Sequence, residues 1–333
     1  MAGAGPEAEP GIAAGPRRVL LTGAGGFVGR HLLPMLRAAL PGARLVATTR
    51  HGDGKVAGAD ETVTLDLLST DLRPAIRALA PDAVVHLAAQ ASVGASFRDP
   101  RLTWRTNLDG TLALAEAILA ERPAARLLHI SSAEVYGLSF QAGTPLDENA
   151  PMQPANPYAA SKAAADLAVG EMALRGLDAV RLRPFNQTGP GQSPDYVVAA
   201  FARQVALIEV GQQEPVIRTG ALDRWRDFLD VRDVCTAYAA ALVRPELPPG
   251  TVLNLATGTP RRVGDILDGL IERAGLKGVR VEAEAARLRP TDLERTAGSV
   301  AAARGTLDWR PATPWQRTLD DMLADWRARV AAG

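Results

Sequence analysis

The sequence predicts an α/β protein built on a doubly wound parallel sheet. From residue 17 onward, short apolar runs rich in β-branched residues alternate with segments of helical periodicity. This alternation is typical of parallel strands covered by helices on both faces. A glycine loop, TGAGGFVGR, directly follows the first apolar run and precedes the first helical segment. A strand, a glycine loop and a helix in that order open many folds of this class.

The elements follow in chain order from the period of the apolar residues. Period-2 or continuous apolar runs predict strands at 17–22, 45–49, 62–66, 83–89, 126–132 and 179–185. Helical periodicity predicts helices at 28–40, 71–80, 102–120 and 156–175. After Pro184 this regularity weakens, and Pro, Gly and Arg collect in loops at 186–196, 220–227 and 286–294. Apolar alternation returns at 228–243 and 251–257.

These shifts predict two domains. A disordered tail is expected at 1–16, where Pro and Glu replace the basic start and apolar stretch of a signal peptide. The main sheet domain is expected at 17–183, with re-entry at about 228–258. A smaller α/β ligand-binding domain is expected at 184–227 and 259–333.

Composition excludes several functional classes. The 333 residues carry 37 Lys and Arg against 37 Asp and Glu, so no overall field favours nucleic acid or an anionic membrane. No apolar run approaches the ~20 residues that span a bilayer. The single cysteine, Cys235, excludes an internal disulfide, and the four histidines form no zinc-like spacing. We expect a soluble cytoplasmic protein without metal.

The glycine loop predicts a dinucleotide site. Gly23 permits a tight turn, Gly26 lets backbone approach phosphate oxygens, and Gly29 lets the following helix pack closely. The helix N-terminus would then face the pyrophosphate. An ordinary flexible turn is the alternative, and the strand and helix on either side disfavour it.

The end of the second strand indicates which dinucleotide binds. An Asp or Glu there usually meets a free ribose 2′-hydroxyl, but this chain has Thr49 followed by Arg50. Arg50, with Arg30, can pair with a 2′-phosphate, which favours NADP(H) and keeps NAD(H) as the alternative. Asp66, after the third strand, is expected near the adenine or as a helix cap.

Tyr158 and Lys162 form the candidate acid/base pair. Residues i and i+4 share one helix face, so we expect the ammonium to lie beside the phenol and lower its pKa from ~10. Tyr-x-x-x-Lys is common by itself. Its context here is Ser132, which ends the strand at 126–132, where ligands bind in doubly wound sheets.

The motifs TGAGGFVG, HLAAQASV, TNLDGT, SSAEVYG and PYAASK, in this order, resemble the extended short-chain dehydrogenase/reductase superfamily. The resemblance implies a Rossmann-type fold and a catalytic group of Ser132, Tyr158 and Lys162. It also implies that Asn107, at a helix distortion, helps to place the lysine. Further cofactor contacts that it implies are Phe27, Val28, Leu67, Leu87, Ala88 and Ala89.

The segments RPFNQTGPGQSPDY, RDFLDVRDV and ARLRPTDL resemble the GDP-4-keto-6-deoxyhexose reductases within that superfamily. This resemblance implies hydride transfer from the nicotinamide to the C4 ketone of a GDP-linked sugar, with Tyr158 as general acid. Gln187 stands where that family has histidine. The substrate contacts that it implies are Gln90, Ser92, Asn186, Val197, Arg218, Arg226 and Arg289.

Ala133 helps to distinguish a reductase from the alternative activities of the superfamily. Dehydratases of nucleotide sugars usually carry an acid beside Glu134, since elimination of water needs one proton removed and another delivered. A methyl group delivers no proton, which favours reduction. A 4-epimerase, a 4,6-dehydratase and a non-catalytic redox sensor are the alternatives. The resemblance also implies a homodimer through helices near 101–121 and 157–174.

Overall fold

The computed structural model describes residues 15–52, 54–69, 71–284 and 293–332. The predicted tail therefore lies almost wholly outside the described residues. Seven parallel strands form the main sheet in the order β11-β6-β5-β4-β1-β2-β3. Their bounds are β1 (Arg18–Thr22), β2 (Arg44–Thr49), β3 (Glu61–Thr64), β4 (Ala83–His86), β5 (Arg126–Ile130), β6 (Ala179–Pro184) and β11 (Val252–Leu255). The predicted fold class is confirmed.

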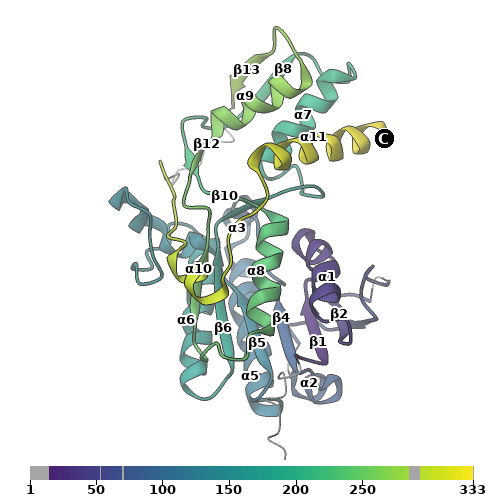
Figure 1. Cartoon of the computed structure of the whole chain (residues 1–333), viewed down its shortest axis with the longest axis vertical. Coiled ribbons are helices and arrows are strands. Elements are labelled where there is room, and N and C mark those ends of the chain that lie inside the picture. The colour runs from purple at the N-terminus through teal and green to yellow at the C-terminus, as the bar shows by residue number, and fades with distance from the viewer. Residues whose placement is uncertain (1–14, 53, 70, 285–292, 333) are drawn as a thin grey trace, which may run out of the picture.

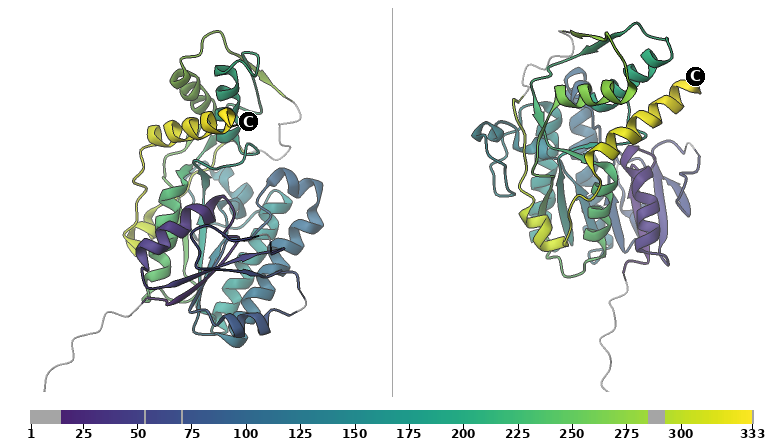
Figure 2. Two further views of the ribbon diagram at one scale, coloured as in Figure 1. Left: turned by 90° about the vertical axis from the view of Figure 1, so that its right-hand side faces the viewer. Right: turned by 45° about the horizontal axis from the view of Figure 1, so that its top comes forward.

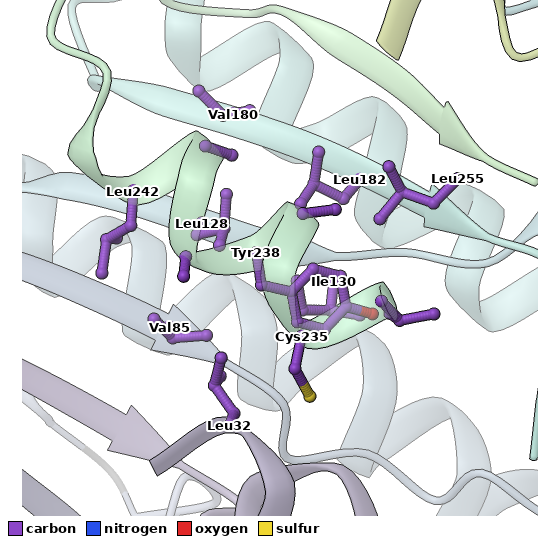
Figure 3. Packing of buried hydrophobic residues seen from close by; sticks show 14 of the residues in the cluster. Leu32, Val85, Leu128, Ile130, Val180, Leu182, Cys235, Tyr238, Leu242 and Leu255 are labelled. Carbon is purple, nitrogen blue, oxygen red and sulfur yellow. The ribbon is translucent and has the colours of Figure 1, made fainter. Parts of the chain in front are cut away.

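Helices cover both faces of this sheet (Figure 1). One face packs under α1 (Phe27–Ala39), α8 (Val231–Val243) and α10 (Ala301–Leu307). Leu32, Cys235 and Tyr238 meet the strand residues Val85 and Leu128 there, as Figure 3 shows. The opposite face packs under α2 (Arg73–Leu79), α5 (Gly110–Glu121) and α6 (Pro157–Leu174). Near-continuous apolar strands are required because both of their faces are buried.

A smaller lobe sits above the carboxyl ends of the strands (Figures 1 and 2). Its apolar core, including Phe201, Leu270 and Met322, joins α7 (Val197–Glu209), α9 (Val263–Ala274) and α11 (Trp315–Ala331). The described residues also form three short two-stranded sheets outside the main sheet. They are β7 (Asn186–Thr188) with β10 (Phe228–Asp230), β9 (Trp225–Arg226) with β12 (Arg261–Arg262), and β8 (Val216–Thr219) with β13 (Arg280–Ala283).

Two segments differ from the sequence prediction. The helix expected at 102–120 is broken into α4 (Pro100–Trp104), a π-helical turn η1 (Arg105–Asp109) and α5. The predicted division gave all of 259–333 to the smaller domain. Ala303, Leu307 and Trp309 instead pack in the core of the main sheet, so the chain returns to that layer before α11. The remaining elements are α3 (Val93–Arg98) and a 3-10 segment, η2 (Ala133–Ala142).

Candidate active site

A cleft of about 1600 Å³ runs between the carboxyl ends of the strands and the smaller lobe. The sheet layer contributes the glycine loop and the ends of β2, β4, β5 and β6, and the lobe contributes α7 and the segment 219–226. Strand carboxyl ends are the ligand side of a doubly wound sheet. The topology therefore brings the polar strand ends of the sequence to one wall.

The glycine loop has the geometry of a phosphate cradle. Gly23 has φ +69°, and a Cβ there would lie 2.7 Å from the Ala88 nitrogen. A Cβ on Gly29 would lie 2.2 Å from the Ala24 carbonyl oxygen, so only glycine lets α1 approach the loop. No side chain caps the N-terminus of α1, and its first turn has no acidic residue. Uncapped amides at a positive helix end fit a dinucleotide pyrophosphate.

Arg50 lines the cleft at the carboxyl end of β2. It lies on the wall with Thr49 and Asp66, and its Nε is 3.7 Å from the Asp66 carboxylate. Both side chains are well exposed, so this ion pair is weak and exchangeable. Arg30, predicted beside it, is not on the wall: its Nε donates to the Gly25 carbonyl at 2.9 Å.

The residues of the predicted catalytic group come from two different segments of the chain. Tyr158 and Lys162 lie in the first turns of α6, whose N-cap Asn156 accepts from the Ala159 amide at 2.8 Å. Ser132 follows β5 and caps η2 by accepting from the Glu134 amide at 3.2 Å. All four predicted side chains on this side line the cleft: Ser132, Glu134, Tyr158 and Lys162.

The expected acidification of Tyr158 by Lys162 is corrected by the structure. Burial raises the pKa of the Tyr158 phenol well above its ordinary range, and the Ser132 hydrogen bond offsets only part of this. Nearby Glu134 raises it further. The Lys162 ammonium instead donates to the Ile130 carbonyl at 2.5 Å. Burial lowers the pKa of Lys162 to about 8, against the opposing effect of Asp166. Desolvation outweighs the charge that spacing alone suggested.

Asn107 and Gln90 lie behind the wall rather than on it. Asn107 is fully buried in the π-turn. Its Oδ1 accepts from the main-chain amide of Gln90 at 2.7 Å, and its Nδ2 donates to Ser161 Oγ at 3.0 Å. The Gln90 side chain is bonded to Thr103 Oγ1 at 3.1 Å. The predicted distortion at Asn107 is therefore present, and its side chain reaches α6 through Ser161.

The lobe side of the cleft holds Asn186, Val197 and Arg226, and Ser92 lies on the opposite side. Arg218 points away: it lies in β8, 3.8 Å from Glu284, and its side chain is 54% exposed. Arg289 lies outside the described residues. Gln187 lines the cleft and donates through Nε2 to the Tyr238 hydroxyl at 3.4 Å.

Sequence reasoning missed several wall residues. They include Arg98 at the end of α3, Arg203 on α7, and the cleft residues Phe185, Tyr196 and Arg224. No role was predicted for any of them, although Phe185 and Tyr196 lie inside the segment RPFNQTGPGQSPDY. They come together only because α3, α7 and the loop at 219–226 fold over the same strand ends.

The described part of the chain was searched for a metal-binding cluster and for a membrane-spanning helix. Within the described ranges, no cluster of three or more His, Cys, Asp or Glu side chains is arranged to hold a metal ion. Across the same ranges, no helix is long and apolar enough to cross a membrane.

Comparison with known proteins identifies the family. The family model described as GDP-mannose 4,6 dehydratase matches residues 20–322. GDP-6-deoxy-D-mannose reductase from Pseudomonas aeruginosa is 36% identical over 316 residues, covering 94% of this chain and 98% of the relative. The solved structure of RMD from Pseudomonas aeruginosa complexed with NADPH has a TM-score of 0.79 at 33% identity, covering 94% of this chain and 99% of that one.

A second solved structure is of a different activity. UDP-glucose 4-epimerase from Thermus thermophilus in complex with NAD has a TM-score of 0.80 at 31% identity, covering 93% of this chain and 99% of that chain. The predicted resemblance and enzyme class are confirmed by these relatives. The chain therefore belongs to the family described as GDP-mannose 4,6 dehydratase, within the extended short-chain dehydrogenase/reductase superfamily.

Proposed function

We propose that this protein reduces the C4 ketone of a GDP-linked 4-keto-6-deoxyhexose with NADPH, as in the conversion of GDP-4-dehydro-6-deoxy-D-mannose to GDP-D-rhamnose. The observation that carries the proposal is the convergence of Ser132, Tyr158 and Lys162 on the cleft that also contains the glycine loop. The similarity to GDP-6-deoxy-D-mannose reductase supports the choice of substrate.

The residues of this chain supply the proton and the orientation. When bound, the nicotinamide supplies a hydride to C4. Tyr158 donates its phenolic proton to the ketone oxygen, so hydride and proton together yield one secondary alcohol. A raised pKa keeps the phenol protonated at neutral pH, which a general acid requires at the start of the step. Ser132 donates a hydrogen bond to the same oxygen and stabilises its developing charge.

Lys162 contributes a positive charge to the cleft below about pH 8. Its tie to the Ile130 carbonyl holds the ammonium against the floor of the cleft, where ribose hydroxyls of a bound nucleotide can accept from it. Protonated Lys162 also stabilises negative charge that develops on the phenolic oxygen as the proton leaves. The lysine therefore acts on the phenol during the transfer rather than by acidifying it beforehand.

Ala133 supports reduction over dehydration. It is buried, with 7% of its surface exposed, in the turn between Ser132 and Glu134. Elimination of water from a sugar needs a base and an acid near adjacent carbons, and a methyl group supplies neither. Glu134 is held by Asn156, whose Nδ2 donates to it at 3.3 Å. This bond suits a carboxylate that orients a sugar hydroxyl.

The size and charge of the cleft support a two-ligand reaction. Its volume of about 1600 Å³ exceeds the roughly 300–1,000 Å³ of a pocket for one small molecule. Arg226 lies on the lobe side and suits a diphosphate through its planar donors. Arg289, outside the described residues, is proposed as its partner. Arg50 supports NADPH over NADH through its reach to a 2′-phosphate.

A direct assay tests the proposal. Purified protein would be mixed with GDP-4-keto-6-deoxymannose and either NADPH or NADH, with cofactor oxidation followed by absorbance and the sugar identified. The expected result is one equivalent of GDP-6-deoxyhexose per NADPH oxidised. Conversion of a UDP-hexose with no net change in cofactor would instead establish an epimerase, and formation of a 4-keto sugar from GDP-mannose a dehydratase.

We further propose a cytoplasmic homodimer. Exposed apolar side chains lie on α4 and α6, where Leu102, Leu167 and Leu174 are 40%, 59% and 90% exposed. An apolar surface of this kind favours association with a second copy. Sedimentation of the protein, alone and as Leu167→Glu, tests this: the variant should shift toward the monomer. One buried cysteine, Cys235, suits a reducing compartment.

A further inference from the structure

His86 ends β4 inside the main sheet, and its side chain does not line the cleft. Its side chain is 1% exposed, and it hydrogen-bonds through both ring nitrogens. Nδ1 lies 2.7 Å from Thr22 Oγ1, at the end of β1 just before the glycine loop. Nε2 lies 2.9 Å from Thr111 Oγ1, in the first turn of α5. His86 therefore connects the cofactor side of the sheet to the helix that follows the π-turn.

The donors and acceptors in this chain can be assigned in one direction. The Thr111 hydroxyl lies 2.7 Å from the Asn107 carbonyl oxygen, which can only accept, so the hydroxyl hydrogen is committed there. Thr111 Oγ1 must then accept from His86 Nε2–H. In a neutral ring Nδ1 accepts, so the Thr22 hydroxyl donates to it. Thr22 Oγ1 in turn accepts from the Ala88 amide at 3.2 Å. Every group is satisfied only with the Nε2–H tautomer.

This series of hydrogen bonds ends at Asn107, whose side chain contacts α6. In the π-turn the Gly110 amide bonds to the Arg105 carbonyl, five residues back, and the Asn107 carbonyl accepts from the Thr111 hydroxyl at 2.7 Å. The side chain of Asn107 extends from the same residue to Ser161 Oγ at 3.0 Å. Ser161 Oγ donates to the Tyr158 carbonyl at 2.8 Å. A shift of the Asn107 backbone would therefore move the first turn of α6.

We propose that His86 is a positioning residue for the proposed reduction. As its Nε2–H tautomer it fixes, through Thr111, the backbone of Asn107, and Asn107 holds the turn of α6 that carries Tyr158 and Lys162. The distances are those of ordinary strong hydrogen bonds, and burial makes an unpaired member costly. Displacement of a catalytic side chain from its optimal position lowers kcat without a comparable loss of substrate binding.

His129 provides a matched control within the same fold. It is the register partner of His86 on β5, it is also fully buried, and the two ring centroids are 5.9 Å apart. Among the described residues, neither ring nitrogen of His129 has a hydrogen-bond partner. A histidine that merely fills space should behave like His129. A histidine that positions α6 should not.

The test uses the same two substitutions at both positions. Glutamine carries its amide nitrogen near the place of ring Nε2, whereas asparagine reaches only the place of Nδ1. We expect His86→Asn to lower kcat by about tenfold or more, a barrier change of about 1.4 kcal/mol. The Kd for NADPH, measured by fluorescence, should stay within about threefold of wild type. His86→Gln should recover most of kcat, and His129→Asn and His129→Gln should keep it within about twofold.

Thr111→Val tests the same link without touching the histidine. It should lower kcat as much as His86→Asn does. The double variant should be no slower than the slower single variant, since both substitutions break the same hydrogen-bonded link. Wild-type kcat in Thr111→Val, or an equal loss in His129→Asn, overturns the proposal. Thermal unfolding of every variant separates a folding defect from a kinetic one. If His86→Asn does not fold, the kcat of Thr111→Val tests the proposal in its place.

A final measurement does not depend on the substrate. In protein with 15N-labelled histidine, NMR reports which ring nitrogen carries the proton. The expected result for His86 at neutral pH is a neutral ring protonated at Nε2, and a proton on Nδ1 or a cationic ring overturns the hydrogen-bond chain. Absence of turnover in the wild-type assay would refute the proposed function, whereas this NMR result would still decide the tautomer.

Discussion

The Lys162 ammonium donates a 2.5 Å hydrogen bond to the main-chain carbonyl of Ile130, the last residue of β5. Helix α6 is thereby tied directly to the strand that leads into Ser131 and Ser132. The same burial that makes this bond strong lowers the pKa of Lys162 to about 8. The lysine that the sequence pairs with a phenol is thus also a link between α6 and the sheet.

The first prediction concerns the pH dependence of Lys162. Its folded-state pKa is lowered, so the ammonium is present below about pH 8 and lost above it. We expect kcat/KM for NADPH to fall as pH rises through that value, because kcat/KM reports groups of the free enzyme. Steady-state rates between about pH 6 and pH 10 measure it. Lys162→Arg should be slower but should not lose activity over this range, because arginine stays charged. An equal fall in that variant would contradict the assignment.

Tyr158→Phe should remove the general acid. We expect kcat to fall by about 10²–10⁴-fold, the usual contribution of a positioned proton donor. The ring itself remains, so the Kd for NADPH should change by less than about threefold. Single-turnover kinetics with saturating cofactor measure the chemical step directly. A variant that retains more than about a tenth of wild-type kcat would exclude Tyr158 as the proton donor.

Gly29→Ala should disrupt the cofactor loop. Its Cβ would lie 2.2 Å from the Ala24 carbonyl oxygen, so α1 must move away from the loop. We expect loss of stability of about 1–3 kcal/mol, typical of overpacking, and weaker NADPH binding. Gly25→Ala is the control, because its Cβ would meet only a Val56 methyl group at 4.0 Å. Denaturant unfolding and titration with NADPH measure both, and similar behaviour of the two variants would argue against the cradle.

Arg50→Ala should reduce the preference for NADPH. Loss of a charge-assisted contact to a 2′-phosphate is expected to raise the Kd for NADPH by about tenfold or more. The Kd for NADH should change little, since it lacks that phosphate. Arg30→Ala is the matched control: its guanidinium is bonded to the Gly25 carbonyl and lies off the cleft wall. A uniform effect on both cofactors would mean that Arg50 supports the fold instead.

The buried histidines predict sensitivity to acid. Burial and the Lys162 charge lower the pKa of His86 to about 3, and burial also lowers that of His129. The unfolded chain therefore binds more protons below about pH 6.5, and stability falls as pH decreases toward 3. Between about pH 6.5 and pH 4.5, the difference between the folded and unfolded pKa of His86 alone should lower the free energy of unfolding by roughly 2–3 kcal/mol. Urea unfolding at each pH measures this. His86→Asn should show a shallower decline, and an unchanged slope would contradict the prediction.

Much of the fold and part of the site could be predicted from local sequence. Most strands of the main sheet are short, largely apolar runs, and the glycine loop is recognisable because its residues are neighbours in the chain. Tyr158 and Lys162 were expected on one face because helix geometry fixes the i, i+4 relationship. The order of the motifs was enough to indicate the family, which the comparisons confirm.

The properties that depend on distant segments were not predictable in the same way. The return of 301–309 to the sheet follows from packing between elements far apart in the chain. The family resemblance indicated the helix distortion at Asn107, whereas its π-helical form and the contact of Asn107 with Ser161 are known only from the fold. Arg203 faces the cleft and Arg218 does not, although both carry the same charge in the same lobe. The raised pKa of Tyr158 is decided by the atoms that surround it. Spacing along the chain determined which residues could meet, whereas burial, which sums contributions from the whole fold, decided their charge states and contacts.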